Sequence, residues 1–210
     1  MDYTTEPLIR YLDDAASAQP TPGGGSVAAM AAALASTMAS MAAGFTAGKE
    51  KFKSVEPEVR ASLARLADLR QALLDFVHED MAAYGAVMAA YKLPKSTDAE
   101  KAARAEAVRI ATKSSLGLVE RVMDATCEVI QVSRRLADIA NPNLVSDVGV
   151  ASELALGAAR AARINVAVNL SGYSDAADAA AVRDRTDKSV AEAERIAAET
   201  RDAVMKHLCK

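Results

Sequence analysis

The chain has 210 residues, of which 48 are alanine and only eight are aromatic, and 51% of it is apolar. Its formal charge of −3 gives no basic footprint for nucleic acid, and its length suits a single domain with a sizeable core. So much alanine with so few aromatic residues argues against a β-sandwich, a disordered chain and a disulfide-rich module, and predicts closely packed helices.

Proline and glycine breaks divide the chain into segments whose apolar residues recur three and four apart, the spacing of helices that bury one face. Leu8, Ile9 and Leu12 form the apolar side of the first segment, and Thr97 with Glu100 supplies a capping box for a later one. The sequence predicts one all-α domain, residues 1–210, folded as a bundle of five to seven helices. The expected helices cover residues 5–17, 26–44, 58–91, 97–111, 116–140, 147–170 and 175–208.

Residues 26–45 carry no charge over a length that suffices to span a bilayer. They consist mainly of Ala, Ser, Thr and Met rather than the large apolar residues that drive membrane insertion. A helix that is apolar on every side is typical of the centre of a soluble bundle, so we expect no membrane span. Burying this helix on all sides in a chain of this size favours a homodimer.

Histidine and cysteine are too few and too scattered for most catalytic or metal sites. Asp75 and His78 stand three apart, as in half of a carboxylate–histidine metal site, but no second pair completes it. The same shortage disfavours a Ser–His–Asp or Cys–His nucleophile. Cys127 and Cys209 have no paired spacing, and the first residues are acidic where a secretory signal carries Lys or Arg. We therefore expect no metal and a reduced, cytoplasmic setting.

A glycine run precedes the long apolar helix. Gly23, Gly24 and Gly25, followed by Ser26, lack the lysine of a phosphate-binding P-loop. A glycine-rich entry still exposes backbone N–H groups at the positive end of a helix, which suits a carboxylate or a phosphate. The alternative is a plain loop that admits the helix to a crowded core, and both interpretations stay open.

Asp80 borders the expected apolar side of its helix, which includes Val77, Met81, Tyr84 and Met88. If this carboxylate is desolvated, its pKa is raised, which suits acid–base catalysis. On a solvated helix face it would be an ordinary surface acid.

Two other polar groups are candidates. Asn165 and Asn169 are four apart on one face of an apolar helix, so they need partners in a hydrogen-bond network or a ligand. Asn141, Ser146 and Asp147 cluster at a predicted helix start, where turn and cap chemistry, with Ser146 as the N-cap, also explains them.

Six segments follow one another in a recognisable order: Pro20–Ala29, Gly48–Phe52, Asp80–Tyr84, Tyr91–Lys95, Asn141–Ala151 and Asn165–Leu170. In this order and spacing they resemble the cyclodeaminase/cyclohydrolase family. That family includes the cyclodeaminase domain of formiminotransferase-cyclodeaminase and bacterial methenyltetrahydrofolate cyclohydrolases. The resemblance covers most of the chain and is less marked over the last helix.

The resemblance implies an all-helical homodimer that binds a tetrahydrofolate derivative in a cleft at the subunit interface, with no cofactor besides this substrate. It implies Asp80 as the acid–base group, and Lys49, Lys51 and Lys92 as contacts to the substrate's glutamate tail. The other positions that it implies in the cleft are Gly23, Gly24, Gly25, Ser26, Tyr84, Asn141, Ser146, Asp147, Asn165 and Asn169.

The implied activity is hydrolysis of 5,10-methenyltetrahydrofolate to 10-formyltetrahydrofolate. The bridging carbon of this cation is already electrophilic, so water adds without a metal, and one carboxylate can take a proton from water and return it to N5. Formiminotetrahydrofolate cyclodeamination, which releases ammonia, passes through a similar tetrahedral carbon and is the alternative. A non-catalytic helical protein that binds folate or a partner is the third hypothesis.

Overall fold

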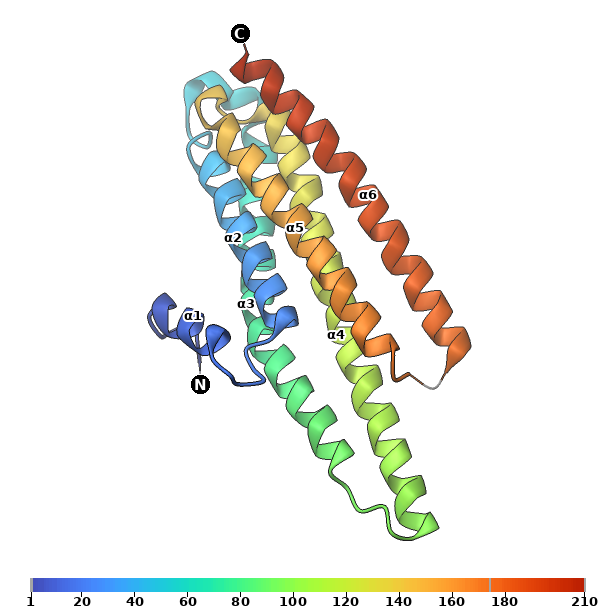
Figure 1. The fold of residues 1–210 in the computed structure, drawn as a ribbon. Coiled ribbons are helices and arrows are strands. Elements are labelled where there is room, and N and C mark those ends of the chain that lie inside the picture. The colour runs from blue at the N-terminus through green and yellow to red at the C-terminus, as the bar shows by residue number, and fades with distance from the viewer. Residues whose placement is uncertain (1, 174, 210) are drawn as a thin grey trace.

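The computed structural model describes residues 2–173 and 175–209, and these ranges contain helices and no strands (Figure 1). This confirms the predicted all-α bundle of five to seven helices. The α-helices are α1 Leu8–Ala16, α2 Gly24–Gly44, α3 Glu56–Tyr91, α4 Asp98–Ile139, α5 Val145–Leu170 and α6 Ala176–Leu208. Two 3-10 turns, η1 Glu50–Val55 and η2 Pro142–Leu144, join helices at one end of the bundle.

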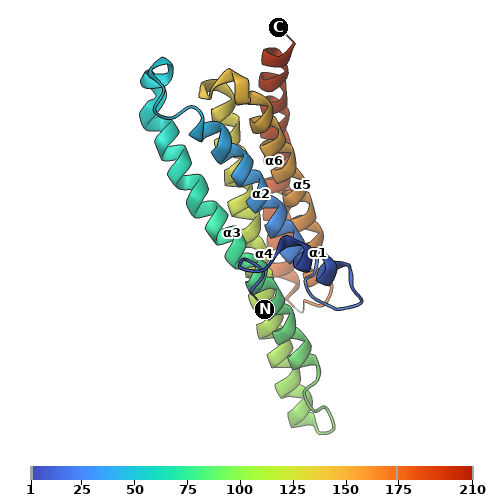
Figure 2. The same ribbon diagram turned by 90° about the vertical axis from the view of Figure 1, so that its left-hand side faces the viewer.

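The alanine-rich helix α2 lies between α3 and α5, with α4 behind it (Figure 2). Its inward alanines are fully buried, and their small side chains let the neighbouring backbones approach closely. The Ser36 hydroxyl joins α2 to α3 by donating a 2.7 Å hydrogen bond to the carbonyl oxygen of Leu66. By length and composition α2 could span a membrane, but half of its most apolar stretch is buried within the bundle. It is therefore the core helix that the sequence predicts, although in one chain its outer side stays exposed.

Two predicted helix boundaries are wrong. Residues 97–111 and 116–140 belong to one helix, because the buried side of α4 continues through Ser115 and no proline interrupts it. Ser146 does not cap α5, which begins one residue earlier without a side-chain cap. The Asn141 side chain instead accepts a 3.1 Å hydrogen bond from the backbone N–H of Asn143 and stabilises η2. The predicted capping box of Thr97 and Glu100 is confirmed.

Helix α1 projects from the side of the bundle near the start of α2 (Figure 1). Its predicted apolar side is wrong as a packing surface, since Leu8, Ile9 and Leu12 are all exposed. Tyr11 is instead the buried residue of α1.

The α3–α4 hairpin extends beyond the other helices (Figure 1). The apolar side of α3 therefore leaves the core part-way along: Val77 is buried, whereas Tyr84 and Met88 are exposed. The polar residues near this point border a cavity rather than a packed interior.

We expect Ala35→Leu to lower the free energy of unfolding by about 1–3 kcal/mol, because the larger side chain has no space inside the bundle. Ala86→Leu, at an exposed position of α3, is the matched control and should change stability by less than about 0.5 kcal/mol. Urea titration measures both. Equal effects of the two changes would contradict the close packing around α2.

Candidate active site

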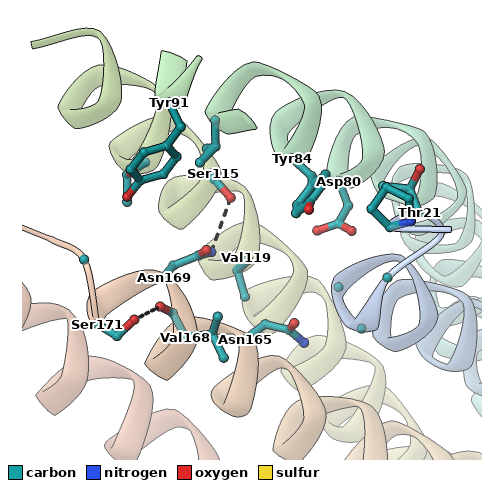
Figure 3. A pocket seen from close by; sticks show the side chains of 17 residues that line it. Thr21, Asp80, Tyr84, Tyr91, Ser115, Val119, Asn165, Val168, Asn169 and Ser171 are labelled. Carbon is teal, nitrogen blue, oxygen red and sulfur yellow. Dashed lines mark hydrogen bonds between the residues drawn. The ribbon is translucent and has the colours of Figure 1, made fainter. Parts of the chain in front are cut away.

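A cavity of about 390 Å³ lies where the start of α2 meets α3, α4 and the end of α5 (Figure 3). It is open on one side and is lined by both polar and apolar groups. Its polar or glycine lining residues are Thr21, Gly23, Gly24, Gly25, Asp80, Tyr84, Tyr91, Thr112, Ser115, Asn165, Asn169, Ser171 and Gly172.

Asp80, on α3, lies directly against the first turn of α2. Its Oδ2 accepts a 2.9 Å hydrogen bond from the backbone N–H of Ser26. Gly23 stands at the N-cap of α2 and makes no side-chain cap, so this carboxylate pairs one of the amides that the first turn leaves free. The positive end of α2 also favours the negative charge. The glycine run thus does expose amides to an anion, and the anion seen here is the protein's own carboxylate.

Two glycines of this run make the close approach possible. A Cβ atom at Gly25 would overlap Oδ1 of Asp80, closer than non-bonded heavy atoms approach in proteins. A Cβ atom at Gly24 would lie 3.0 Å from Oδ1 of Asn165. Neither glycine has a positive φ, so both are needed for space rather than for backbone conformation.

The environment of Asp80 favours its protonated form more than water does. Burial raises the pKa of the carboxyl above its usual value, and the hydrogen bond from the Ser26 amide partly offsets that rise. The side chain is half-buried. The alternative of a fully solvated surface acid is therefore wrong.

Amides on α5 face Asp80 and Tyr84 across the cavity (Figure 3). The Asn165 amide nitrogen donates a 3.0 Å hydrogen bond to the Ala161 carbonyl. The Asn169 amide nitrogen donates a 3.3 Å hydrogen bond to Ser115 Oγ. Each asparagine is thus held in place through its own NH2 group. The carbonyl oxygens of both side chains remain as acceptors within the cavity.

Two tyrosines on α3 give the cavity its aromatic surface. Tyr84 and Tyr91 stand seven residues apart, which places them two turns apart on one face of the helix. The Arg104 guanidinium lies 5.3 Å from the centre of the Tyr91 ring, and its Nε donates a 3.0 Å hydrogen bond to the Tyr91 carbonyl. The ring of Tyr91 is therefore held from the side of α4.

Sequence reasoning missed Thr112 and Ser115, the two hydroxyl residues of the α4 wall. Thr112 and Ser115 are both buried and stand three residues apart on the side of α4 that carries Leu116 and Val119. The signal available in the sequence was the pair of hydroxyl residues within an apolar stripe, which is the argument that singled out the α5 asparagines.

Seven of the predicted site residues do not line this cavity: Ser26, Lys49, Lys51, Lys92, Asn141, Ser146 and Asp147. Ser26 is fully buried beside the cavity and reaches Asp80 through its backbone amide. Lys92 is exposed just beyond Tyr91. The other five lie at the far end of the bundle, past the end of α2 and around the start of α5. The Asn141 N–H donates a 2.8 Å hydrogen bond to Thr46 Oγ1, which holds these two far-end segments together. Within one chain, the far-end group is separated from Asp80 by the length of α2.

The cavity offers one acid among neutral groups. Asp80, Tyr84 and Tyr91 are its ionisable lining residues. In the described ranges, no three His, Cys, Asp or Glu side chains converge as metal ligands would. This arrangement can hold a polar aromatic ring beside one carboxylate and can move one proton.

Comparison with known proteins shows which protein family this chain is similar to. The family model of formiminotransferase-cyclodeaminase matches residues 7–188. A methenyltetrahydrofolate cyclohydrolase from Methylorubrum extorquens is 38% identical over 172 residues, which are 82% of this chain and 83% of that protein. The formimidoyltransferase-cyclodeaminase of Sus scrofa is 29% identical over 193 residues, which are 92% of this chain and 36% of the pig protein.

The fold agrees with these sequence matches. The crystal structure of formiminotetrahydrofolate cyclodeaminase from Thermotoga maritima superimposes on this chain with a TM-score of 0.88 and 27% sequence identity. The match covers 97% of this chain and 98% of the Thermotoga maritima chain. The protein therefore has the cyclodeaminase fold. It belongs to the formiminotransferase-cyclodeaminase family, which confirms the resemblance found in the sequence.

We expect Asp80→Asn to melt at the same temperature as the wild type, or higher, at pH 7. The amide oxygen can still accept the bond from Ser26, and no charge is buried. Because the folded-state pKa of Asp80 is raised, the wild type loses stability as pH rises from the ordinary aspartate value through that raised value. The difference in melting temperature between Asp80→Asn and the wild type should therefore become smaller as pH falls toward about 4.

Thermal unfolding at several pH values checks this dependence. Asp75→Asn, which removes one carboxylate at an exposed position of the same helix, is the matched control. Marked destabilisation of Asp80→Asn at neutral pH would contradict the account of a desolvated carboxylate.

Proposed function

We propose that this protein is a methenyltetrahydrofolate cyclohydrolase that works in the cytoplasm without a metal or a further cofactor. The observation that carries the proposal is the single half-buried carboxylate of Asp80, set among neutral groups in an open cavity. The substrate is a cation whose reactive carbon needs a base for water and a negative charge nearby. The 38% identity to the Methylorubrum extorquens cyclohydrolase over most of both chains supports this activity over the alternatives.

In this mechanism Asp80 acts first as a base. Its carboxylate accepts a proton from water while the water oxygen bonds to the carbon that bridges N5 and N10. The carboxylic acid then returns its proton to N5 as the bond between N5 and this carbon breaks. The hydroxyl on this carbon loses its proton to solvent, which leaves the neutral formyl group on N10 and accounts for the one proton that the overall reaction releases. The raised pKa of Asp80 suits both steps, because a catalytic acid–base group works best when its pKa approaches the working pH.

The neutral walls bind and orient the substrate. Tyr84 and Tyr91 offer ring faces on which the pterin or the aminobenzoyl ring stacks. The carbonyl oxygens of Asn165 and Asn169 accept hydrogen bonds from the polar edge of the pterin. Each interaction is neutral, so Asp80 remains the charge closest to the cationic carbon.

Two copies of the chain pair through the outer sides of α2 and α5 in this proposal. Helices α2 and α5 are neighbours (Figure 2). Each carries an uncharged stripe at helical spacing. Leu34 is 50% exposed and Ile164 is 66% exposed, although both are large and apolar. Exposed apolar surface of this extent marks an interface. The stripes consist of Val27, Ala31, Leu34, Met38 and Met41 on α2 with Phe45 directly after it, and Val150, Leu154, Gly157, Ala161, Ile164 and Val168 on α5.

The charges of α5 support this choice of face. Arg160 pairs with Glu194 at 2.9 Å, and Arg163 pairs with Asp187 at 2.6 Å, both across to α6. The charged side of α5 is thus already covered within the chain. Its apolar stripe is left for a second copy.

Pairing of this kind also brings the remaining predicted site residues toward the cavity. Val168 belongs to the α5 stripe and lines the cavity, so the cavity opens at the edge of the proposed interface. The 21-residue α2 is about 30 Å long, and an antiparallel pair places the far end of one copy beside the cavity of the other. Lys49 and Lys51 would then lie where the anionic glutamate tail leaves the cavity.

Formiminotetrahydrofolate cyclodeamination is the second candidate. The Thermotoga maritima structure, which covers nearly all of this chain, favours keeping it. In that reaction N10 attacks the formimino carbon and ammonia leaves, so the same carboxylate can transfer the proton.

The near-ultraviolet absorbance of methenyltetrahydrofolate distinguishes the two activities. Loss of this absorbance above the buffer rate reports hydrolysis, and its appearance from the formimino substrate reports cyclodeamination. A protein that only binds folate would show neither change and would still be stabilised against heat by folate.

We expect Asp80→Asn to lower the turnover of 5,10-methenyltetrahydrofolate by at least about 100-fold, the scale of general acid–base catalysis. Circular dichroism and size-exclusion chromatography should match those of the wild type, because the amide keeps the hydrogen bond from Ser26. Asp75→Asn should retain full activity. Near-normal turnover by Asp80→Asn would remove Asp80 from the mechanism.

We expect Leu34→Glu to convert the dimer to a monomer, because it places a charge in the middle of the α2 stripe. Ile110→Glu, at a 56% exposed position on the α4 extension, is the matched control and should leave the dimer intact. Light scattering at micromolar concentration measures both. A monomeric wild type would contradict the proposed pairing.

A further inference from the structure

Helix α1 is tied to the bundle through a buried tyrosine. Tyr11 is 3% exposed, and its hydroxyl lies 3.0 Å from Oγ of Ser26, which is fully buried. Tyr3 packs edge-on against the Tyr11 ring, with ring centres 5.2 Å apart. The remainder of α1 is half-buried or exposed. The buried hydroxyl pair is therefore the polar link between α1 and the start of α2.

Ser26 takes part in two contacts that lead to the cavity. Its side chain pairs with Tyr11, and its backbone N–H donates to the carboxylate of Asp80. Both contacts hold the same residue of the first turn of α2. A displacement of Ser26 that follows loss of the Tyr11 contact would therefore also change the geometry of the amide that donates to the carboxylate.

We propose that Tyr11 is a positioning residue for Asp80: its buried hydroxyl fixes Ser26, whose amide orients the carboxylate within the cavity. This inference rests on the proposed function, in which Asp80 is the catalytic base. The link is the hydroxyl rather than the ring. A buried hydroxyl left without a partner is costly, so loss of the Tyr11 hydroxyl forces Ser26 to adjust.

The ionisable neighbours of Asp80 on its own helix are engaged elsewhere. His78 Nε2 lies 3.1 Å from an Asp2 carboxylate oxygen, although not in hydrogen-bonding geometry, and its ring stacks with Tyr3. Glu79 pairs with Arg121 at 2.7 Å.

The other elements around Asp80 supply no competing charge. From α1 the ionisable neighbour is Tyr11, and burial raises the pKa of its phenol, so it stays neutral. From α2 come backbone amides, and α4 and α5 line the cavity with hydroxyl, amide and apolar side chains. Tyr84 is the other ionisable group on this stretch of α3. The amide of Ser26 is thus the neighbour that lowers the pKa of Asp80 against the effect of burial.

The test is Tyr11→Phe, which keeps the buried ring and removes the hydroxyl. If the hydrogen bond from the Ser26 amide to the carboxylate becomes weaker, it offsets less of the rise in pKa that burial causes. The pKa of Asp80 should therefore be higher in the variant. The acidic limb of the profile of kcat/KM against pH should move up by roughly half a unit, with about a threefold loss of rate below the limb and little above it. A purely structural loss would lower the rate evenly at every pH.

A second measurement does not depend on activity. Carbon-13 NMR of the Asp80 carboxyl in the intact protein follows its titration in the wild type and in Tyr11→Phe. A rise in the variant supports the proposal, and an unchanged titration in a folded variant overturns it. If the wild type hydrolyses no folate substrate, the proposed function fails while this titration still decides the role of Tyr11.

Matched variants separate the hydroxyl link from general damage to α1. Tyr3→Phe removes the hydroxyl that donates a 2.8 Å bond to Asp14 and should leave the Asp80 titration unchanged. Ser26→Ala should raise the Asp80 pKa as Tyr11→Phe does, and it also serves if Tyr11→Phe fails to fold. In the double variant the Asp80 pKa should rise no further than in either single variant, because the two hydroxyls form one pair and either change removes it. Additive shifts, or an equal shift in Tyr3→Phe, would overturn the proposal.

Discussion

The hydrogen bond between the Ser26 amide and the Asp80 carboxylate joins the start of the core helix to the candidate active site. It requires α2 and α3 to lie so close that Gly25 has no room for a Cβ atom. It also keeps a carboxylate in a partly desolvated place, because the amide and the positive end of α2 offset some of the cost. The same contact therefore pairs a free amide at the start of α2 and leaves room only for glycine at position 25 in the first turn of α2. In our proposal it also positions the base for proton transfer.

The alanine content of the chain has a consequence for assembly. Thin side chains let α2 pack against α3 and α5, but such a flat layer leaves one side of α2 and α5 uncovered in a single chain. The uncovered side is apolar along its whole length, and the cavity opens at its edge near Val168. In our proposal the surface that completes the core also completes the site, so pairing and catalysis share one constraint.

Local sequence signals predicted most of the helices because proline, glycine and capping residues act within a few positions. The boundary of α3, the Thr97 capping box and the border position of Asp80 are examples. The continuity of α4 through Ser115 was missed, because tertiary packing along one buried side decides it. The exposure of Leu8, Ile9 and Leu12 was missed for a similar reason, since an apolar stripe does not say which surface it meets.

The site residues also differ in whether local sequence patterns predict where they lie. Residues that gather within one chain, such as Gly25, Asp80 and Asn165, follow from motif order and helix periodicity. The far-end residues Lys49 and Asn141 are separated from them by the length of α2, and periodicity holds no information on how two copies pair. Tyr11 escaped notice because its role depends on a contact with a residue 15 positions away, which no local pattern encodes.

The most direct test of the central claim is a crystal structure with 5-formyltetrahydrofolate, a stable relative of the proposed substrate. The account predicts the pterin in the cavity between α3 and α5, with N5 or the formyl carbon within hydrogen-bonding reach of Asp80, directly at about 3 Å or through one water. Binding outside this cavity, or with Asp80 turned away from the reactive carbon, would contradict it.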